Sequence, residues 1–217
     1  MKLSRIALAT MLVAAPLAAA NAAHQAGDVI FRAGAIGVIA NSSSDYQTGA
    51  DVNLDVNNNI QLGLTGTYML SDNLGLELLA ATPFSHKITG KLGATDLGEV
   101  AKVKHLPPSL YLQYYFFDSN ATVRPYVGAG LNYTRFFSAE SLKPQLVQNL
   151  RVKKHSVAPI ANLGVDVKLT DNLSFNAAAW YTRIKTTADY DVPGLGHVST
   201  PITLDPVVLF SGISYKF

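Results

Sequence analysis

The sequence predicts an all-β protein: an eight-stranded antiparallel transmembrane barrel with short periplasmic turns and long outer loops. Three observations lead to this prediction: an export signal at the N-terminus, a low charged fraction without a long apolar helix, and repeated alternation of apolar residues. Of the 217 residues, 48% are hydrophobic and only 15% are charged, whereas about 25% charged is usual in soluble domains. The chain therefore requires an apolar environment that does not depend on membrane helices.

Residues 1–23 have the layout of a secretory signal peptide and are not expected to belong to the barrel. A positively charged start is followed by a short apolar core and a run of small residues. The apolar core is shorter than the ~20 residues that a membrane-spanning helix needs. We expect cleavage after Ala22 or Ala23, which leaves residues 24–217 as a single outer-membrane barrel domain.

Eight segments alternate as expected for strands with one lipid-facing side and one interior side. The clearest case begins at Ile60, where every second residue up to Leu70 is apolar or small. In a transmembrane strand, residues of one parity face lipid and residues of the other parity face the lumen. In chain order, the predicted strands are 29–38, 60–70, 74–80, 110–116, 127–133, 157–169, 173–181 and 207–217.

The connections between these strands alternate between short and long. Tight polar turns are predicted at 71–73, 118–121 and 170–172, and connections of 15 to 19 residues near 40–58, 86–102, 138–155 and 188–202. Outer-membrane barrels have short periplasmic turns and long outer loops, so the N-terminus is placed on the periplasmic side. The terminal Phe217, on the lipid face, resembles the signal that the barrel-assembly machinery reads during biogenesis.

A soluble eight-stranded barrel such as a lipocalin is the alternative fold. Its interior would be apolar and its exterior polar. In this chain the residues between the apolar positions include glutamine, asparagine, aspartate, lysine and arginine. The polar parity must therefore face inward, which favours the membrane barrel.

The inward parity predicts a polar plug near the periplasmic end of the barrel. The charged side chains that point inward close to that end are Arg32, Glu77, Arg124, Asp166 and Lys168. Opposite charges held away from water should pair and form hydrogen bonds with one another. Since eight strands enclose a space only just wide enough for side chains or one small ligand, a water-filled porin is not expected.

Above the plug, toward the outer face, the inward parity becomes apolar. The side chains concerned are Leu79, Ala81, Pro83, Tyr111, Ile160, Trp180, Val208 and Phe210. Ordinary packing of the lumen would explain this set. The alternative is a hydrophobic pocket that is open to the outside and closed below, with the bulky Leu79 and Trp180 as its floor or gate.

Three prolines fall where strands should be paired. Pro83 lies in the outer half of the third predicted strand, and Pro107 and Pro108 lie in the outer half of the fourth. Proline has no N–H for the ladder and is normally excluded from paired strand interiors. A gap in this hairpin would let an apolar molecule pass sideways into lipid, while a bulge or an early strand end without an opening is the alternative.

The chain resembles the outer membrane protein W (OmpW) family across essentially its whole mature length. The matching motifs are Ala26-Gly27-Asp28, Phe31-Arg32-Ala33-Gly34, Gln61-Leu62-Gly63-Leu64-Thr65, Leu78-Leu79-Ala80-Ala81-Thr82-Pro83-Phe84-Ser85-His86-Lys87-Ile88, His105-Leu106-Pro107-Pro108, residues 124–133, Trp180-Tyr181, Thr186-Thr187-Ala188 and Leu204-Asp205-Pro206. The resemblance implies an outer-membrane barrel with a narrow hydrophobic channel that admits small hydrophobic molecules and releases them laterally into the membrane.

Within this resemblance, Leu79 and Trp180 fall on positions that look like the channel constriction of the family. Departures from the family are concentrated in the outer segments 41–55 and 139–155. The choice of solute, and any recognition of phage or bacteriocin, therefore stay open.

Three functions are compatible with these features. The preferred one is a passive channel for small hydrophobic solutes. The second is a structural or adhesive barrel that acts through its outer loops, for example as a receptor for phage or bacteriocin. The third, a lipid-modifying enzyme, would need His86, Ser85 and Asp96 together at the outer rim; nothing in their spacing requires this, and no catalytic residues are assigned.

No cofactor, metal or nucleic acid is expected as a partner. His86 and His105 flank the second outer loop, but two histidines without a third ligand make a weak metal site. The net charge of +2 is too small to indicate a nucleic-acid partner. A basic cluster at Arg151, Lys153 and Lys154 could meet lipopolysaccharide phosphates, although a solvated loop face explains it as well.

Overall fold

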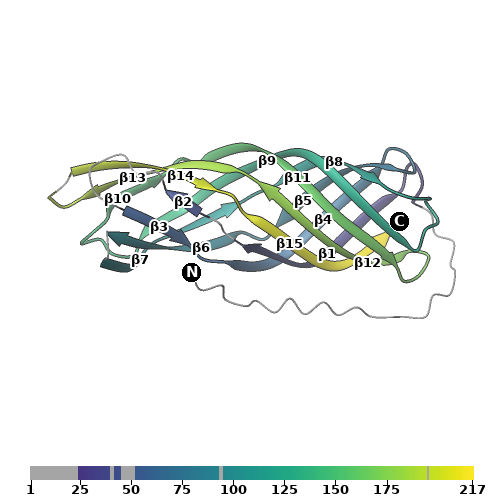
Figure 1. Ribbon diagram of the computed structural model, residues 1–217, viewed down its shortest axis with the longest axis horizontal. Helices are drawn as coiled ribbons and strands as arrows, with labels where there is room; N and C mark the ends of the chain where they lie inside the picture. Colours follow the sequence, from purple (N-terminus) through teal and green to yellow (C-terminus); the bar gives the residue numbers. More distant parts are fainter. Residues whose placement is uncertain (1–23, 40–41, 45–51, 93–94, 195) are drawn as a thin grey trace.

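The computed structural model describes residues 24–39, 42–44, 52–92, 95–194 and 196–217. The signal peptide predicted at residues 1–23 lies outside these residues. The regular structure within them is β-strand throughout, and none of these residues belongs to a helix long and apolar enough to cross a membrane. Figure 1 shows a long tube of tilted strands that is prolonged at one end by further strands.

Eight antiparallel strands close into a barrel, which confirms the predicted fold. They are β1 (Val29–Ile39), β4 (Asn59–Met69), β5 (Leu74–Ala81), β8 (Ser109–Tyr115), β9 (Val123–Ser141), β11 (His155–Lys168), β12 (Leu173–Thr182) and β15 (Val207–Lys216). Each pairs with its neighbour in this order, and the pairing of β1 with β15 completes the circle. The barrel therefore has no free edge, as a bilayer requires.

The short turns lie together at the end of the barrel that holds the C-terminus (Figure 1). Two of them close in the same way. The amide of Leu70 donates to the carbonyl of Leu74 at 2.7 Å, and the amide of Leu169 donates to the carbonyl of Leu173 at 2.9 Å. The similar sequences of these two turns thus reflect the same backbone hydrogen bonding.

Within their described residues, the four long connections contain seven further strands that the sequence does not predict. These are β2 (Ser42–Ser44), β3 (Val52–Val56), β6 (Phe84–Leu92), β7 (Thr95–Leu106), β10 (Gln148–Val152), β13 (Ile184–Val192) and β14 (Gly196–Leu204). Strands β7, β6 and β3 continue the barrel sheet along the outer part of β9, whereas β10, β13, β14 and β2 form a separate sheet. The outer strands have small apolar cores of their own, one of them formed by Ala188, Tyr190, Val198 and Ile202.

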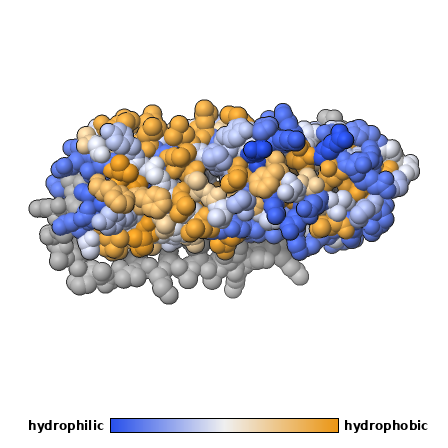
Figure 2. Space-filling model, turned by 180° about the vertical axis from the view of Figure 1, so that it is seen from behind, coloured by the Kyte–Doolittle hydropathy of each residue, from blue (hydrophilic) through white to orange (hydrophobic). Residues whose placement is uncertain are grey.

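The barrel strands are apolar outside, and their inward side chains include buried polar and charged residues. On β9 the outward side chains of Val127, Leu131 and Tyr133 are 45%, 61% and 43% exposed, while the inward Arg124 and Asn132 are buried. Figure 2 shows hydrophobic side chains gathered over the barrel and hydrophilic ones over its outer end. This distribution is the reverse of that in a soluble barrel, so the lipocalin alternative is wrong.

Candidate functional site

Arg32 lies at the centre of a buried network that crosses the lumen. Its guanidinium donates to the carboxylate of Glu77 and, at 2.8 Å, to that of Asp166. It also donates to the hydroxyl of Tyr115 at 2.9 Å and to that of Thr67 at 2.7 Å. The five residues come from β1, β5, β11, β8 and β4. Charge-assisted hydrogen bonds therefore tie five strands together and compensate for the burial of the ions.

The other two charges of the predicted plug lie outside this central network. Arg124 places its guanidinium 5.2 Å from the ring centre of Tyr115 and donates to the backbone carbonyl of Asp72 at 2.9 Å. The ammonium of Lys168 is 3.7 Å from the carboxylate of Asp171. The structure thus brings Arg32 together with the two carboxylates, and it gives Arg124 and Lys168 other partners.

Sequence reasoning based on charged residues missed the neutral groups that complete the network. The side-chain amide of Asn176 donates to Asp166 at 2.8 Å and to the hydroxyl of Tyr126 at 2.9 Å. The guanidinium of Arg32 lies 5.6 Å from the ring centre of Tyr126. Asn176 and Tyr126 have the inward parity of their strands, so the alternation that identified Asp166 could have identified them too.

Tyr111 connects the charged network to the apolar side chains above it. Its hydroxyl donates to the carboxylate of Glu77 and accepts a hydrogen bond from the indole N–H of Trp180 at 2.8 Å. The Trp180 ring meets the Phe210 ring edge-on, with ring centres 6.1 Å apart. Trp180, which is only 2% exposed, is therefore held in one orientation across the lumen.

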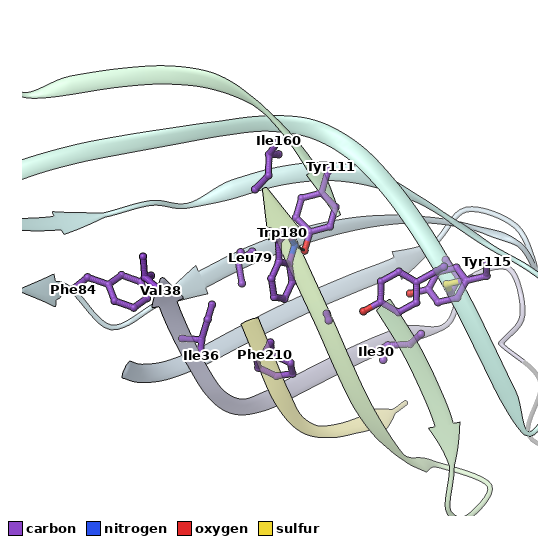
Figure 3. Close-up of a cluster of buried hydrophobic side chains, with 13 residues drawn as sticks. Ile30, Ile36, Val38, Leu79, Phe84, Tyr111, Tyr115, Ile160, Trp180 and Phe210 are labelled. Carbon is purple, nitrogen blue, oxygen red and sulfur yellow. Dashed lines mark hydrogen bonds between the residues drawn. The ribbon is translucent and has the colours of Figure 1, made fainter. Parts of the chain in front are cut away.

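Seven of the eight side chains predicted to point into the apolar lumen lie in or against one buried cluster, which Figure 3 shows around Trp180. Leu79, Tyr111, Ile160, Trp180 and Phe210 belong to it, and Ala81 and Val208 pack against it. The eighth, Pro83, is exposed and lies outside this cluster, because it falls at the irregular junction between β5 and β6. The structure adds Ile36 and Val38 from β1 to this cluster. The cavity that remains among these side chains is about 30 Å³, which is room for water but not for an organic solute.

The three prolines lie at a break in the hairpin wall. Residue pairing between β5 and β8 ends where Leu79 faces Ser109, and pairing between β6 and β7 begins where Phe84 faces His105. Between these two pairs, the four residues 80–83 lie opposite the three residues 106–108. One extra residue on one side is the residue count of a β-bulge. The ladder shifts register by one residue between the barrel and its outer extension.

Hydrogen bonds on the side away from this break hold the Pro107–Pro108 segment against β9. The side-chain amide of Asn132 donates to the hydroxyl of Ser109 at 2.9 Å and to the carbonyl of Pro107 at 3.3 Å. The Ser109 hydroxyl donates to the same carbonyl at 3.2 Å, and the Tyr133 amide donates to the carbonyl of Pro108 at 2.9 Å. These bonds hold β8 against β9 where proline offers no N–H.

His86 and His105 do approach each other, as an aromatic stack beside the cavity. Their ring centres are 5.0 Å apart, and Phe84 and Phe136 lie 5.5 and 5.7 Å from His105. The Nδ1 atom of His86 is 2.7 Å from the carbonyl oxygen of Asn57. In the described part of the chain, no three histidine, aspartate or glutamate side chains are placed to hold a metal ion.

The residues considered for catalysis are held apart. Ser85 and His86 are consecutive in β6 and therefore point to opposite faces of the strand. Asp96 accepts a hydrogen bond from the amide of Gly98 at 2.8 Å and faces Lys91 in register, five residues beyond His86. These three side chains form no hydrogen-bonded chain such as a hydrolase would use.

Comparison with known proteins identifies the family. The model of the OmpW family matches residues 25–217. The outer membrane protein W of Vibrio cholerae is 46% identical over 200 residues, which cover 90% of this chain and 91% of that protein. Among solved structures, OprG from Pseudomonas aeruginosa is similar with a TM-score of 0.82 at 38% identity, covering 90% of this chain and 98% of OprG.

The structure of AlkL in lipid bilayers is similar with a TM-score of 0.71 at 26% identity, covering 94% of this chain and 96% of AlkL. These relatives are named as outer membrane proteins and not as enzymes. Together with the apolar exterior of the barrel, they place this protein in the bacterial outer membrane. The chain belongs to the OmpW family.

Proposed function

We propose that this protein is a passive channel for small hydrophobic molecules, which enter from outside, stop above the plug and leave sideways into the bilayer. The observation that carries the proposal is the direct link between the apolar cluster and the charged network, made by Tyr111. A solute that moved straight down would have to break the ion pairs of Arg32. Separating buried ion pairs costs several kcal/mol, so a sideways exit is favoured.

The outer lumen favours apolar solutes because its lining is mainly apolar and the polar side chains of Ser109, Asn132 and Thr182 are already bonded. Ser109 and Asn132 donate to the carbonyl of Pro107, and Thr182 donates to the carbonyl of Pro159 at 2.9 Å. A polar solute would lose hydrogen bonds to water and find these three groups already bonded, with Nδ1 of His105 left without a partner in the cavity lining, whereas an apolar solute gains from burial. We assign the constriction to Leu79 and Trp180.

The break at Pro83, Pro107 and Pro108 supports the lateral exit. The register shift leaves this part of the wall without a regular backbone ladder. Because the β5–β8 ladder ends at Leu79 and Ser109 and the β6–β7 ladder begins only at Phe84 and His105, the wall can open between them without unpairing a whole strand. The cavity of about 30 Å³ means that the lumen must rearrange to admit a solute.

The test is uptake of a small apolar fluorescent dye into liposomes that contain the folded protein. The variant replaces Pro83, Pro107 and Pro108 with alanine, and the matched control is Pro159→Ala, which alters an exposed proline within the paired strand β11. We expect uptake to collapse in the triple variant and to persist in the control. Uptake no faster than into empty liposomes would refute the channel, and rapid uptake by the triple variant would refute only this exit.

A receptor function is the second candidate, supported by the separate outer sheet of β10, β13, β14 and β2. This sheet has its own apolar cluster and can therefore present a defined surface to a phage or bacteriocin. Deletion of the β13–β14 hairpin, residues 184–204, should abolish adsorption of such an agent if the sheet is the receptor. Unchanged adsorption would exclude this surface.

A further inference from the structure

A group of basic side chains lies at the outer end of the apolar band, on three adjacent strands. We call this group the basic rim and define it as Lys104 on β7, Arg135 on β9, and Lys154 and His155 at the start of β11. Arg135 faces Leu106 of β7 on one side and His155 on the other. The amide of Phe136 donates to the carbonyl of Lys154 at 2.8 Å, which places Lys154 beside Arg135.

The basic rim is located where the hydrocarbon layer ends. The outward apolar positions of β9 run from Val123 to Tyr133 and are followed at once by Arg135. Ten residues of a tilted strand at about 3.3 Å each cover roughly 25 Å of height, which is the height of the apolar band in outer-membrane barrels. On β11 the exposed apolar Val157 has the exposed His155 two residues before it in the chain, which is the direction of the outer end of the barrel.

The strong cations of the rim have no acidic partner. Within the described residues, none of the ion pairs involves Lys104, Arg135 or Lys154. By contrast, Arg183, at the corresponding end of β12, has its Nε atom 2.7 Å from the carboxylate of Asp205. The rim therefore carries uncompensated positive charge beside apolar side chains.

We propose that the basic rim binds the phosphates of lipid A, the acylated and phosphorylated sugar anchor of lipopolysaccharide. Its acyl chains would lie along Leu131, Tyr133 and Val157, which are 61%, 43% and 66% exposed. Arginine binds phosphate oxygens through paired N–H donors. The rim spans two interstrand spacings, about 10 Å, which suits a headgroup with two separated phosphates better than one phosphate.

The experiment measures lipid binding to the folded full barrel in detergent by native mass spectrometry. The probes are bisphosphorylated lipid A, dephosphorylated lipid A and phosphatidylglycerol, with inorganic phosphate as a competitor. The test variant is Arg135→Gln/Lys104→Gln. The charge-matched control is Lys87→Gln/Lys91→Gln, because Lys87 is paired with Glu99 at 2.9 Å and Lys91 faces Asp96 in register.

We expect the unaltered protein to bind bisphosphorylated lipid A in preference to the other two lipids. The test variant should bind it about 30-fold more weakly, since each cation near a phosphate surface contributes about 1 kcal/mol, and the control variant should match the unaltered protein. Equal binding of dephosphorylated lipid A, or equal loss in both variants, would overturn the proposal. So would equal binding of phosphatidylglycerol, or displacement of lipid A by millimolar inorganic phosphate.

Discussion

The indole N–H of Trp180 donates to the hydroxyl of Tyr111 across 2.8 Å, and the same hydroxyl donates to Glu77. One tyrosine therefore joins the apolar cluster of the lumen to the charged network beside it. Movement of Trp180 must disturb the ligands of Arg32, and loss of those ligands must release Trp180. The gate and the plug that we propose are for this reason coupled to each other through Tyr111.

The first prediction concerns this link. Tyr111→Phe should lower the free energy of unfolding by about 1–3 kcal/mol, because it leaves the buried indole N–H of Trp180 without an acceptor and removes one of the hydrogen bonds to Glu77, which keeps Arg32 and Thr67 as partners. Trp180→Phe should also destabilise, and the double variant should lose less than the sum. Urea unfolding in detergent, followed by circular dichroism, measures this coupling. Strictly additive losses would mean that the two side chains do not cooperate.

The second prediction concerns the plug. Arg32→Met should reduce the free energy of unfolding by about 3–5 kcal/mol, since Glu77 and Asp166 would stay buried without a counterion. Adding Glu77→Gln and Asp166→Asn should restore part of that loss. Lys168→Met serves as the control and should cost less than about 1 kcal/mol, because its partner Asp171 is 64% exposed. Equal effects of Arg32→Met and Lys168→Met would contradict the central role of Arg32.

The third prediction concerns close strand packing. A Cβ atom added at Gly130 would lie 2.1 Å from the carbonyl oxygen of Leu110, so Gly130→Ala should force β8 and β9 apart. We expect a loss of at least about 1–3 kcal/mol in the free energy of unfolding. Gly66→Ala is the matched control within the barrel, because a Cβ there meets nothing within 4 Å. Equal stability of the two variants would show that the β8–β9 contact relaxes freely.

The fourth prediction concerns pH and involves His24, which precedes β1 and stacks edge-on against Tyr115 with ring centres 5.5 Å apart. Burial lowers the pKa of His24 from 6.5 to about 4, with Asp166 opposing the shift. Between these values the unfolded chain binds a proton that the folded chain does not. Stability should therefore fall as the pH drops from 6.5 to 4, by at most about 3 kcal/mol, and change little from this cause below pH 4.

The control for this prediction is His24→Asn, which should flatten the dependence of stability on pH over that range. Urea midpoints measured at several pH values between 4 and 7 give the comparison. An identical pH dependence in the unaltered protein and the variant would assign the effect to other groups.

The sequence by itself determined the barrel and the two sides of its wall. Because side chains in a strand alternate with a period of two, apolar Leu62 and Leu64 had to face lipid once Gln61 faced the lumen. The same parity placed Arg32 and Glu77 inside the barrel. Membrane location and strand number followed from local pattern alone, without any knowledge of contacts between strands.

Only the tertiary structure decided which interior groups meet. Contacts across a barrel depend on the stagger of each strand against the next, and a single bulge moves all later pairs. Arg32 therefore pairs with Glu77 and Asp166, whereas Arg124 lies over Tyr115, although all of them share the inward parity.

The outer strands depend on the fold in the same way. Segments such as β13 alternate only modestly in sequence: Lys185 follows the more buried Ile184, and Thr187 follows the more buried Thr186. They become strands because neighbouring segments complete their hydrogen bonds, as β14 does for β13 along its whole length. A lone hairpin is at best marginally stable in water, so the barrel beneath decides that these connections are sheet and not loop.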